Sequence, residues 1–187
     1  MESMDLTIKG SIMLMHNGQL ADPANPHSKA VSMAVKVARQ KKTDVAHEAV
    51  ARAEFEGGLY LDDKGQPCIP GEMLEAVIVE GAKTIKQGNP AKAGIIVEGN
   101  YPLQYKGPRD VDGLWEAGFY KKTSAKIGRM RVMRTRPMFI DWSLSFRIHY
   151  NPSTVSKASV RDFVERAGAE KGLGDWRPRY GRFEIVK

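Results

Sequence analysis

Three arginines, three glycines, a tryptophan and a tyrosine fall within eleven positions near the C-terminus, from Gly172 to Arg182. Arginine binds phosphate oxygens in a fork, the ring faces of Trp and Tyr stack on bases, and glycine lets a backbone approach a ligand closely. The segment therefore predicts contact with the backbone of a nucleic acid. The expected contacts are Gly172, Gly174, Trp176, Arg177, Arg179, Tyr180, Gly181 and Arg182. The alternative is a tight turn with Trp176 in the core and solvated arginines.

A second row of arginines lies in a predicted strand at residues 126–136. The row consists of Arg129, Arg131, Arg134 and Arg136. Strand alternation puts the first two on one face and the last two on the other, unless a bulge near Met133 shifts the register. Because a core face cannot bury two arginines cheaply, we expect a bulge or a strand that projects beyond the sheet. Either would offer the arginines to a polyanion; the alternative is an edge strand whose charges block aggregation.

Few residues suit other chemistry. The single cysteine, Cys68, excludes an intrachain disulfide and a multi-cysteine zinc site. No cluster of His, Cys and Asp has metal-ligand spacing. The Gly172–Gly174 segment precedes a predicted strand rather than a helix, so it is not a dinucleotide fingerprint. We therefore expect no metal and no cofactor.

Length and composition indicate one globular domain, residues 1–187. Hydrophobic residues make up 42% and charged residues 27%, and the net charge is +7, which favours polyanionic partners. The N-terminus lacks the basic and apolar regions of a signal peptide, and no apolar run approaches the ~20 residues of a membrane span. We expect a cytoplasmic protein that does not enter membranes.

The hydrophobic pattern predicts the elements that must position these residues. Strands are expected at 4–15, 126–136, 142–150 and 182–186, with 126–136 and 142–150 paired to each other, and a further short strand is expected at 94–97. Helices are expected at 28–41, 44–56, 71–87 and 156–170. In the strand at 142–150, Arg147 and His149 lie on the outward face, which RNA-recognition folds use for RNA. Its alternative is a sheet face covered by an insertion.

Without insertions, the predicted order is strand, helix, strand, strand, helix, strand, which is the βαββαβ order of an α+β, ferredoxin-like fold with an antiparallel sheet. The core comprises residues 4–15, 69–87 and 125–187. A helical insertion with a small hairpin occupies 16–68, and an irregular insertion occupies 88–124.

Two local patterns resemble the RAMP superfamily of CRISPR-associated proteins. Ile69-Pro-Gly-Glu-Met-Leu-Glu-Ala76 is similar to that superfamily's Ile-Pro-Gly-Ser-Ser-Leu-Lys-Gly signature, and the segment from Gly172 to Phe183 is similar to its glycine-rich loop. Glu72 and Glu75 depart from the pattern and would repel phosphate. The chain also resembles small phage and prophage proteins that share the Gly-Asp-Trp-Arg-Pro ending.

The resemblance implies a relative of the backbone subunit of CRISPR effector complexes, with an RNA-recognition-like fold. Such a protein binds single-stranded RNA or DNA independently of sequence and self-associates into a homo-oligomer or filament along the strand, without catalysis. The first alternative is a metal-independent RAMP endoribonuclease, in which His16, just beyond the first strand, or His27 acts as general acid or base. The second is a phage interaction protein that acts on a host complex or in assembly.

Overall fold

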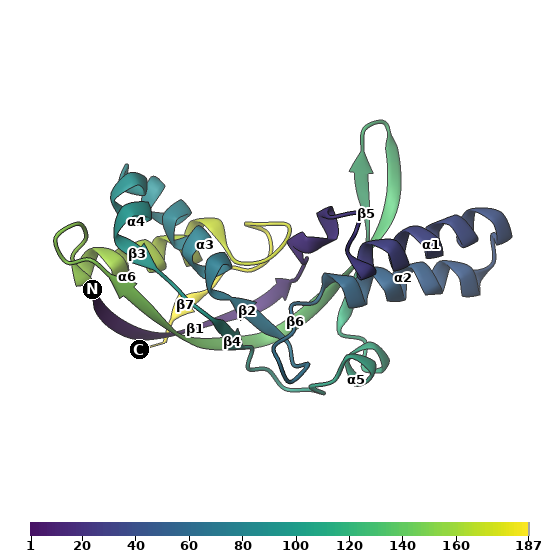
Figure 1. The fold of residues 1–187 in the computed structure, drawn as a ribbon, viewed down its shortest axis with the longest axis horizontal. Coiled ribbons are helices and arrows are strands. Elements are labelled where there is room, and N and C mark those ends of the chain that lie inside the picture. The colour runs from purple at the N-terminus through teal and green to yellow at the C-terminus, as the bar shows by residue number, and fades with distance from the viewer. Residues whose placement is uncertain (187) are drawn as a thin grey trace. The chain divides into compact units, whose positions relative to one another are not determined.

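The computed structural model describes residues 1–186, without the side chain of Ile127, and the chain forms two compact units (Figure 1). Unit 1 comprises Met1–Leu14, Leu61–Lys106 and Phe139–Lys187. Unit 2 comprises Met15–Tyr60 and Gly107–Met138. Residues 125–138, which the sequence placed with the core, thus belong to unit 2.

Unit 1 is built on a sheet with the strand order β3-β6-β1-β7. Its strands are β1 (Glu2–Leu14), β3 (Ile95–Ile96), β6 (Met130–Tyr150) from Phe139 onward, and β7 (Glu184–Ile185). Both edge strands pair antiparallel, with Ile8 opposite Ile185 and Ile95 opposite Tyr150. With α3 (Gly71–Lys83) after β1 and α6 (Lys157–Arg166) after β6, the element order is βαββαβ. The predicted α+β, ferredoxin-like fold class is confirmed.

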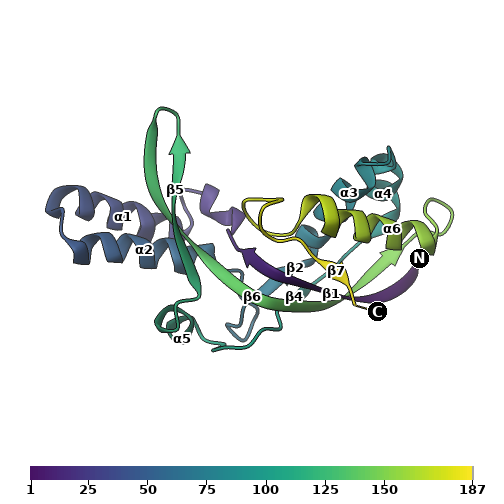
Figure 2. The same ribbon diagram turned by 180° about the vertical axis from the view of Figure 1, so that it is seen from behind.

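The core of unit 1 lies between the sheet and helices α3 and α6, which cover one of its faces (Figure 2). The alternation predicted for the end of β6 is confirmed, since every second side chain from Trp142 to Tyr150 is buried while Ser145 and Arg147 are exposed. The two helices pack closely at Gly81, where an added Cβ would fall 2.4 Å from the carbonyl oxygen of Phe163.

Shorter elements complete unit 1. They are β2 (Cys68–Pro70), which pairs with β4 (Asn100–Pro102), α4 (Gly88–Gly94), and η2 (Ala167–Lys171), a π-helical turn that continues α6. Within residues 88–102, the short strand expected at 94–97 is present as β3, whereas α4 and β4 were not predicted. No helix in the described part of the chain is long and apolar enough to cross a membrane.

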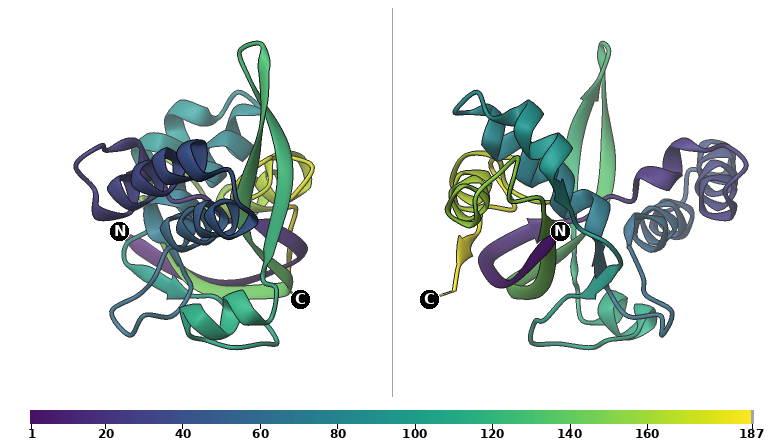
Figure 3. Two further views of the ribbon diagram at one scale, coloured as in Figure 1. Left: turned by 90° about the vertical axis from the view of Figure 1, so that its right-hand side faces the viewer. Right: turned by 60° about the vertical axis from the view of Figure 1, so that its left-hand side comes forward.

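Unit 2 combines a helical hairpin with a strand hairpin (Figure 3). Helices α1 (Pro26–Lys41) and α2 (Asp44–Gly58) pack side by side, and Asn25 and Thr43 cap them by accepting hydrogen bonds from backbone N–H groups of the first turns. Its shorter elements are η1 (Gly18–Ala21), α5 (Val111–Glu116) and β5 (Tyr120–Ile127). Phe55 is fully buried, 5.3 Å from the ring of Trp115 and 6.1 Å from that of Tyr120.

Two strand predictions were wrong. Residues 126–136 and 142–150 do not pair with each other, because most of both segments belong to one long strand, β6. The first part of β6 pairs instead with β5, through a two-residue turn that begins at Gly128, whose φ of 58° suits glycine. The second core strand is β3, which was expected as a short strand within an insertion rather than in the core. Two residues are too few for alternation to show which sheet they join, and the arginine-rich segment shows strand propensity without revealing its partner.

The irregularity of β6 also lies elsewhere than expected. Asp141, rather than a residue near Met133, has a positive φ of 49°. Phe139 and Trp142 on either side are both buried, so the alternation of the strand skips one position there.

Candidate nucleic-acid interface

The two units differ in net charge although their numbers of basic residues are similar. Unit 2 has 14 Lys and Arg residues against 8 Asp and Glu, whereas unit 1 has 15 against 14. Nearly all of the net charge of +7 therefore belongs to unit 2. Because a polyanion is attracted by such an excess, unit 2 is its stronger electrostatic target.

The excess is concentrated in the hairpin of residues 120–137, which we call the basic hairpin. Its seven basic side chains, with no acidic one, are Lys121, Lys122, Lys126, Arg129, Arg131, Arg134 and Arg136. The tip of the basic hairpin stands clear of α1 and α2 (Figure 1). Register places Lys121 opposite Arg136 and Lys126 opposite Arg131. Like charges in directly opposite positions destabilise a strand pair, so a bound polyanion would stabilise the basic hairpin.

Acidic groups of α2 engage the base of the basic hairpin. The Arg134 guanidinium lies 2.5 Å from the carboxylate of Glu54, which is 4% exposed and also accepts the backbone N–H of Thr135 at 2.8 Å. Lys122 lies 3.7 Å from the carboxylate of Glu48. Arg134 and Lys122 are thus already paired with acids of α2, and Arg134 has a structural role that the sequence did not indicate.

Cations nearer the tip are more accessible. Lys126, Arg129 and Arg131 are exposed, and Arg131 donates a 3.2 Å hydrogen bond to the hydroxyl of Ser124. Met130 between them is 69% exposed. This end of the basic hairpin therefore combines positive charge with an exposed apolar side chain.

Two pockets of unit 2 share the Glu54–Arg134 ion pair as part of their walls. The larger, of about 990 Å³, lies among α1, α2 and the basic hairpin and includes Arg39, Lys42 and Lys122. This arrangement was not predicted, because residues up to 124 were assigned to an irregular insertion. The run of seven basic residues without an acid was visible in the sequence and could have indicated it.

The smaller pocket, of about 490 Å³, contains one of the two predicted catalytic histidines. His16 lines it together with Arg134 and Arg136, whereas His27 is exposed on the first turn of α1 and is absent from its lining. The structure therefore brings a histidine close to two arginines in one cavity. No group of three His, Cys, Asp or Glu residues that could hold a metal occurs in residues 1–186.

The C-terminal glycines have packing roles in unit 1. A Cβ at Gly174 would fall 2.2 Å from the carbonyl oxygen of Leu14 in β1, and one at Gly181 would fall 1.7 Å from that of Leu173. Both glycines have positive φ, of 88° and 80°. Gly172 is also buried, with a φ of 78°. The backbone thus approaches other backbone here, which accounts for the glycines without a ligand.

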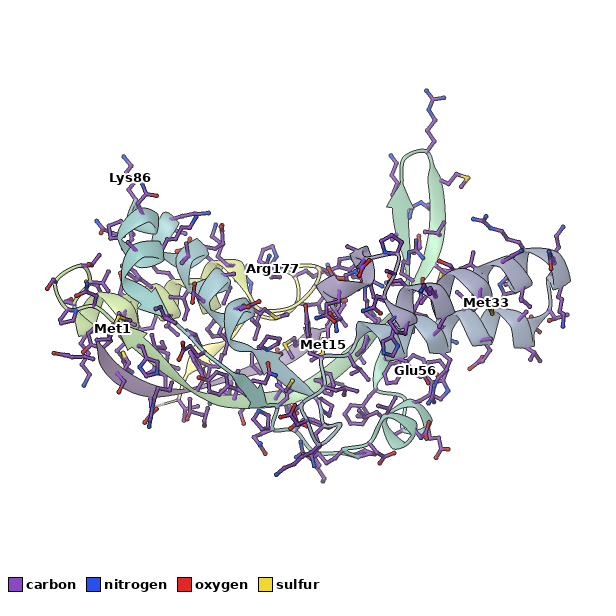
Figure 4. The ribbon with its side chains drawn as sticks, viewed as in Figure 1. Met1, Met15, Met33, Glu56, Lys86 and Arg177 are labelled. Atoms are coloured by element: carbon purple, nitrogen blue, oxygen red, sulfur yellow. The ribbon has the colours of Figure 1, made fainter. Side chains whose placement is uncertain are left out.

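The arginines and aromatic rings of the same loop point outward. Arg177, Arg179 and Arg182 are exposed, and Trp176 and Tyr180 are half-exposed with ring centroids 6.4 Å apart. Trp176 is therefore not a core residue. Figure 4 labels Arg177 on this loop; its guanidinium donates to the carbonyl of Gly172 at 3.5 Å, and that of Arg182 donates to the carbonyl of Pro178 at 3.0 Å.

A pocket of about 1090 Å³ lies between this loop and α3, and its charge is mixed. Glu72 and Glu75 line it, as do Lys83 and Arg177. The carboxylate of Glu75 accepts the backbone N–H of Val97 at 3.1 Å, so it has a structural role. A hydrogen bond from Lys83 lowers the pKa of Glu80, and the charges of Lys171 and Arg177 act in the same direction. Phosphate would be repelled at the start of α3 and attracted near Arg177.

The outward face of the sheet in unit 1 is internally neutralised. Arg147 donates two hydrogen bonds to the carboxylate of Asp5, at 2.8 and 2.9 Å, and these bonds lower the pKa of Asp5. His149 is half-exposed on the same face, and Thr7 hydrogen-bonds to Ser145. Phe, Tyr and Trp are missing from the described outward positions of β1 and β6 in unit 1, so this face lacks the rings on which RNA-recognition domains stack bases.

Solved structures include chains that resemble this one, whereas its sequence matches no known family. No protein-family model matches the chain, and no curated protein matches its sequence. A chain in the cryo-EM structure of the Type III-B Cmr-beta bound to cognate target RNA aligns with a TM-score of 0.49 and 12% identity. The alignment covers 98% of this chain and 59% of that one, so the present chain spans well under two thirds of that chain's length. A likeness of this size does not bear on function.

Proposed function

We propose that the chain binds single-stranded nucleic acid through its phosphates, independently of sequence, with the basic hairpin as the principal contact. One observation carries the proposal: seven cations without an acid occupy the basic hairpin, and register opposes two pairs of them. Repulsion between these cations destabilises the strand pair when nothing is bound. Phosphates lying along the basic hairpin would offset this repulsion. Contacts to phosphate carry no information about the base, so binding would be independent of sequence.

The C-terminal loop supplies a second contact in this proposal. Its three exposed arginines suit phosphates, and the half-exposed rings of Trp176 and Tyr180 offer faces for unpaired bases. Bases are available for stacking only when they are not within a duplex, which favours a single strand. Ribose and deoxyribose strands share the phosphate chemistry, and both are ligands under this proposal.

Self-association along the strand belongs to the same proposal. Unit 2 exposes large apolar side chains: Met33 is 70%, Val45 80% and Met133 63% exposed. A neighbouring copy on the same strand would cover such side chains, and the strand would raise the local concentration of copies.

Size-exclusion chromatography with and without a 40-nucleotide single strand, monitored at 260 and 280 nm, tests both parts. Binding and assembly predict a shift of protein and oligonucleotide together into a larger species. Absence of any co-elution at low salt would contradict binding, whereas co-elution of one protein with one strand would contradict assembly. Trp176→Ala is expected to weaken binding by about 1–3 kcal/mol if the ring stacks on a base.

A second candidate function is metal-independent cleavage of RNA, favoured by His16 lying in one cavity with Arg134 and Arg136. A histidine can move a proton while arginines stabilise a developing charge on phosphate. Structured RNA incubated in EDTA separates the two functions. If the RNA is cleaved, and cleavage is lost in His16→Ala but retained in His27→Ala, the protein is an enzyme. If the RNA stays intact, cleavage is contradicted and only the binding function remains.

A further inference from the structure

Unit 1 contains a further pocket, which shares only Arg182 with the surfaces proposed above. It has a volume of about 610 Å³ and lies where β1, β6 and the segment before β7 meet the turn η2. Its walls include Gly10, Ser11, Asp141, Trp142, Ala169 and Arg182. The volume is in the range of pockets that bind small molecules, and the walls combine an aromatic ring with groups of both charges.

Trp142 supplies an unsatisfied donor to this wall. The side chain is 1% exposed, and its indole Nε1 is buried without a hydrogen-bond partner in the described part of the chain. The indole edge lies against Gly10: a Cβ there would fall 2.7 Å from Cζ2 and 2.8 Å from Cε2, the carbon that carries Nε1. Because a buried N–H normally has an acceptor, this one suits an acceptor brought by a ligand.

Asp141 supplies the complementary acceptor. It is exposed, it holds a left-handed backbone with a φ of 49°, and its carboxylate makes no hydrogen bond or ion pair with the rest of residues 1–186. Aspartate adopts this backbone more readily than most residues, and here it accompanies the irregularity of β6 described above. This conformation leaves a free carboxylate next in sequence to the residue with the unsatisfied N–H.

Arg182 links the pocket to the C-terminal loop. Its Nε donates to Pro178, which leaves both terminal nitrogens for an anion, whereas the neighbouring Lys9 is neutralised by Glu184 at 3.1 Å. The ligand that fits therefore has an apolar part, carries a donor beside an acceptor at one edge, and bears an anion. A nucleotide has all three features: a base with donor and acceptor edges, and a phosphate.

We infer that this pocket binds one nucleotide, with its base edge between Trp142 Nε1 and the Asp141 carboxylate and its phosphate on Arg182. The inference rests on the proposed function for the source of that nucleotide, which is a bound strand. It differs from that function in requiring a discrete, saturable site for a single unit rather than a charged surface.

Calorimetric titration of the full chain with each of the four 5′-ribonucleoside monophosphates, and with inorganic phosphate, tests the inference. Ala169→Phe places a ring at the exposed rim of the pocket, and Ala158→Phe, on an exposed face of α6 outside it, is the matched control. We expect saturable 1:1 binding of at least one monophosphate, weakened at least about tenfold by Ala169→Phe and unchanged by Ala158→Phe, whereas inorganic phosphate binds far more weakly.

Asp141→Asn is a second variant, because asparagine tolerates the left-handed backbone and removes only the charge. We expect it to weaken binding about tenfold, as loss of a hydrogen bond to a charged group does. Monophosphate binding that is absent, equal to that of inorganic phosphate, or insensitive to both variants overturns the inference. A 40-nucleotide strand that binds normally in the same variants would leave the proposed function standing, and failure of that strand with retained monophosphate binding would overturn the function alone.

Discussion

Removal of one like-charge pair from the basic hairpin should change its affinity for nucleic acid and its stability in opposite directions. In the double variant Lys126→Thr, Arg131→Thr, both substituted residues are exposed and directly opposite each other, and threonine preserves strand propensity. Because like charges in this arrangement repel, the variant should be as stable as the parent or more stable, by about 0.2–1 kcal/mol. If these residues bind phosphate, the affinity of the variant for nucleic acid should nevertheless be lower than that of the parent.

The magnitude follows from counterion release. Four cations of the basic hairpin, Lys121, Lys126, Arg129 and Arg131, have no ion pair in the described part of the chain. If each contacts one phosphate of a single strand, the slope of log K against log salt is about −2.8, and the double variant halves it to about −1.4. Between 50 and 200 mM salt, affinity should then fall about 50-fold for the parent and about sevenfold for the variant.

Fluorescence anisotropy of a labelled single strand, repeated across this salt range, measures the slope. The matched control is Lys64→Gln with Lys157→Gln, which removes the same net charge from two exposed residues of unit 1. We expect the control to keep a slope near that of the parent. An unchanged slope in the hairpin variant, or an equal loss in the control, would refute the assignment of phosphate contacts to the basic hairpin.

Three further outcomes test packing and reactivity. Glu54→Gln should destabilise the protein by about 1–3 kcal/mol in thermal unfolding, because it discharges a buried carboxylate that accepts two hydrogen bonds; an unchanged melting temperature would deny that role. Gly181→Ala should cost about 3 kcal/mol or more, since its Cβ would overlap the carbonyl of Leu173, whereas Gly65→Ala, with a φ of 73° and open space, should cost only about 1–2 kcal/mol. Burial and the charges of two nearby aspartates raise the pKa of Cys68 to about 11, so its thiol should resist alkylation at pH 8 and react on unfolding or as the pH approaches 11; rapid alkylation of the folded protein at pH 8 would contradict this burial.

Fold class was predictable from the sequence because the decisive signals are local. Alternation at residues 142–150 reports one buried face regardless of which strands lie alongside, and the helices at 71–83 and 157–166 follow from their apolar stripes. Strand pairing is not local. The partner of Lys126 is Arg131 rather than a residue beyond 142, because Gly128 permits a turn that joins β5 to β6.

The candidate site divides in the same way. Positions of arginines and aromatic rings are properties of the sequence, and Arg177, Arg179 and Arg182 are exposed, as both interpretations of the C-terminal segment required. The engagement of Arg134 was hidden, because its partner Glu54 lies 80 residues away along the chain. So was the reason for the C-terminal glycines, whose close neighbours include the backbone of β1.

By itself, the sequence determined the charge of this protein, the types of its secondary structure and the residues able to contact phosphate, because each depends on residue type and on neighbours a few positions away. The tertiary structure alone decided where that charge is unbalanced. It assigned the excess to unit 2, paired two cations of the basic hairpin with α2, and buried the indole N–H of Trp142 beside the unpaired carboxylate of Asp141. These outcomes depend on contacts between segments that are distant in the sequence. Such contacts determine whether a charge or a buried donor has a partner, and therefore its free energy.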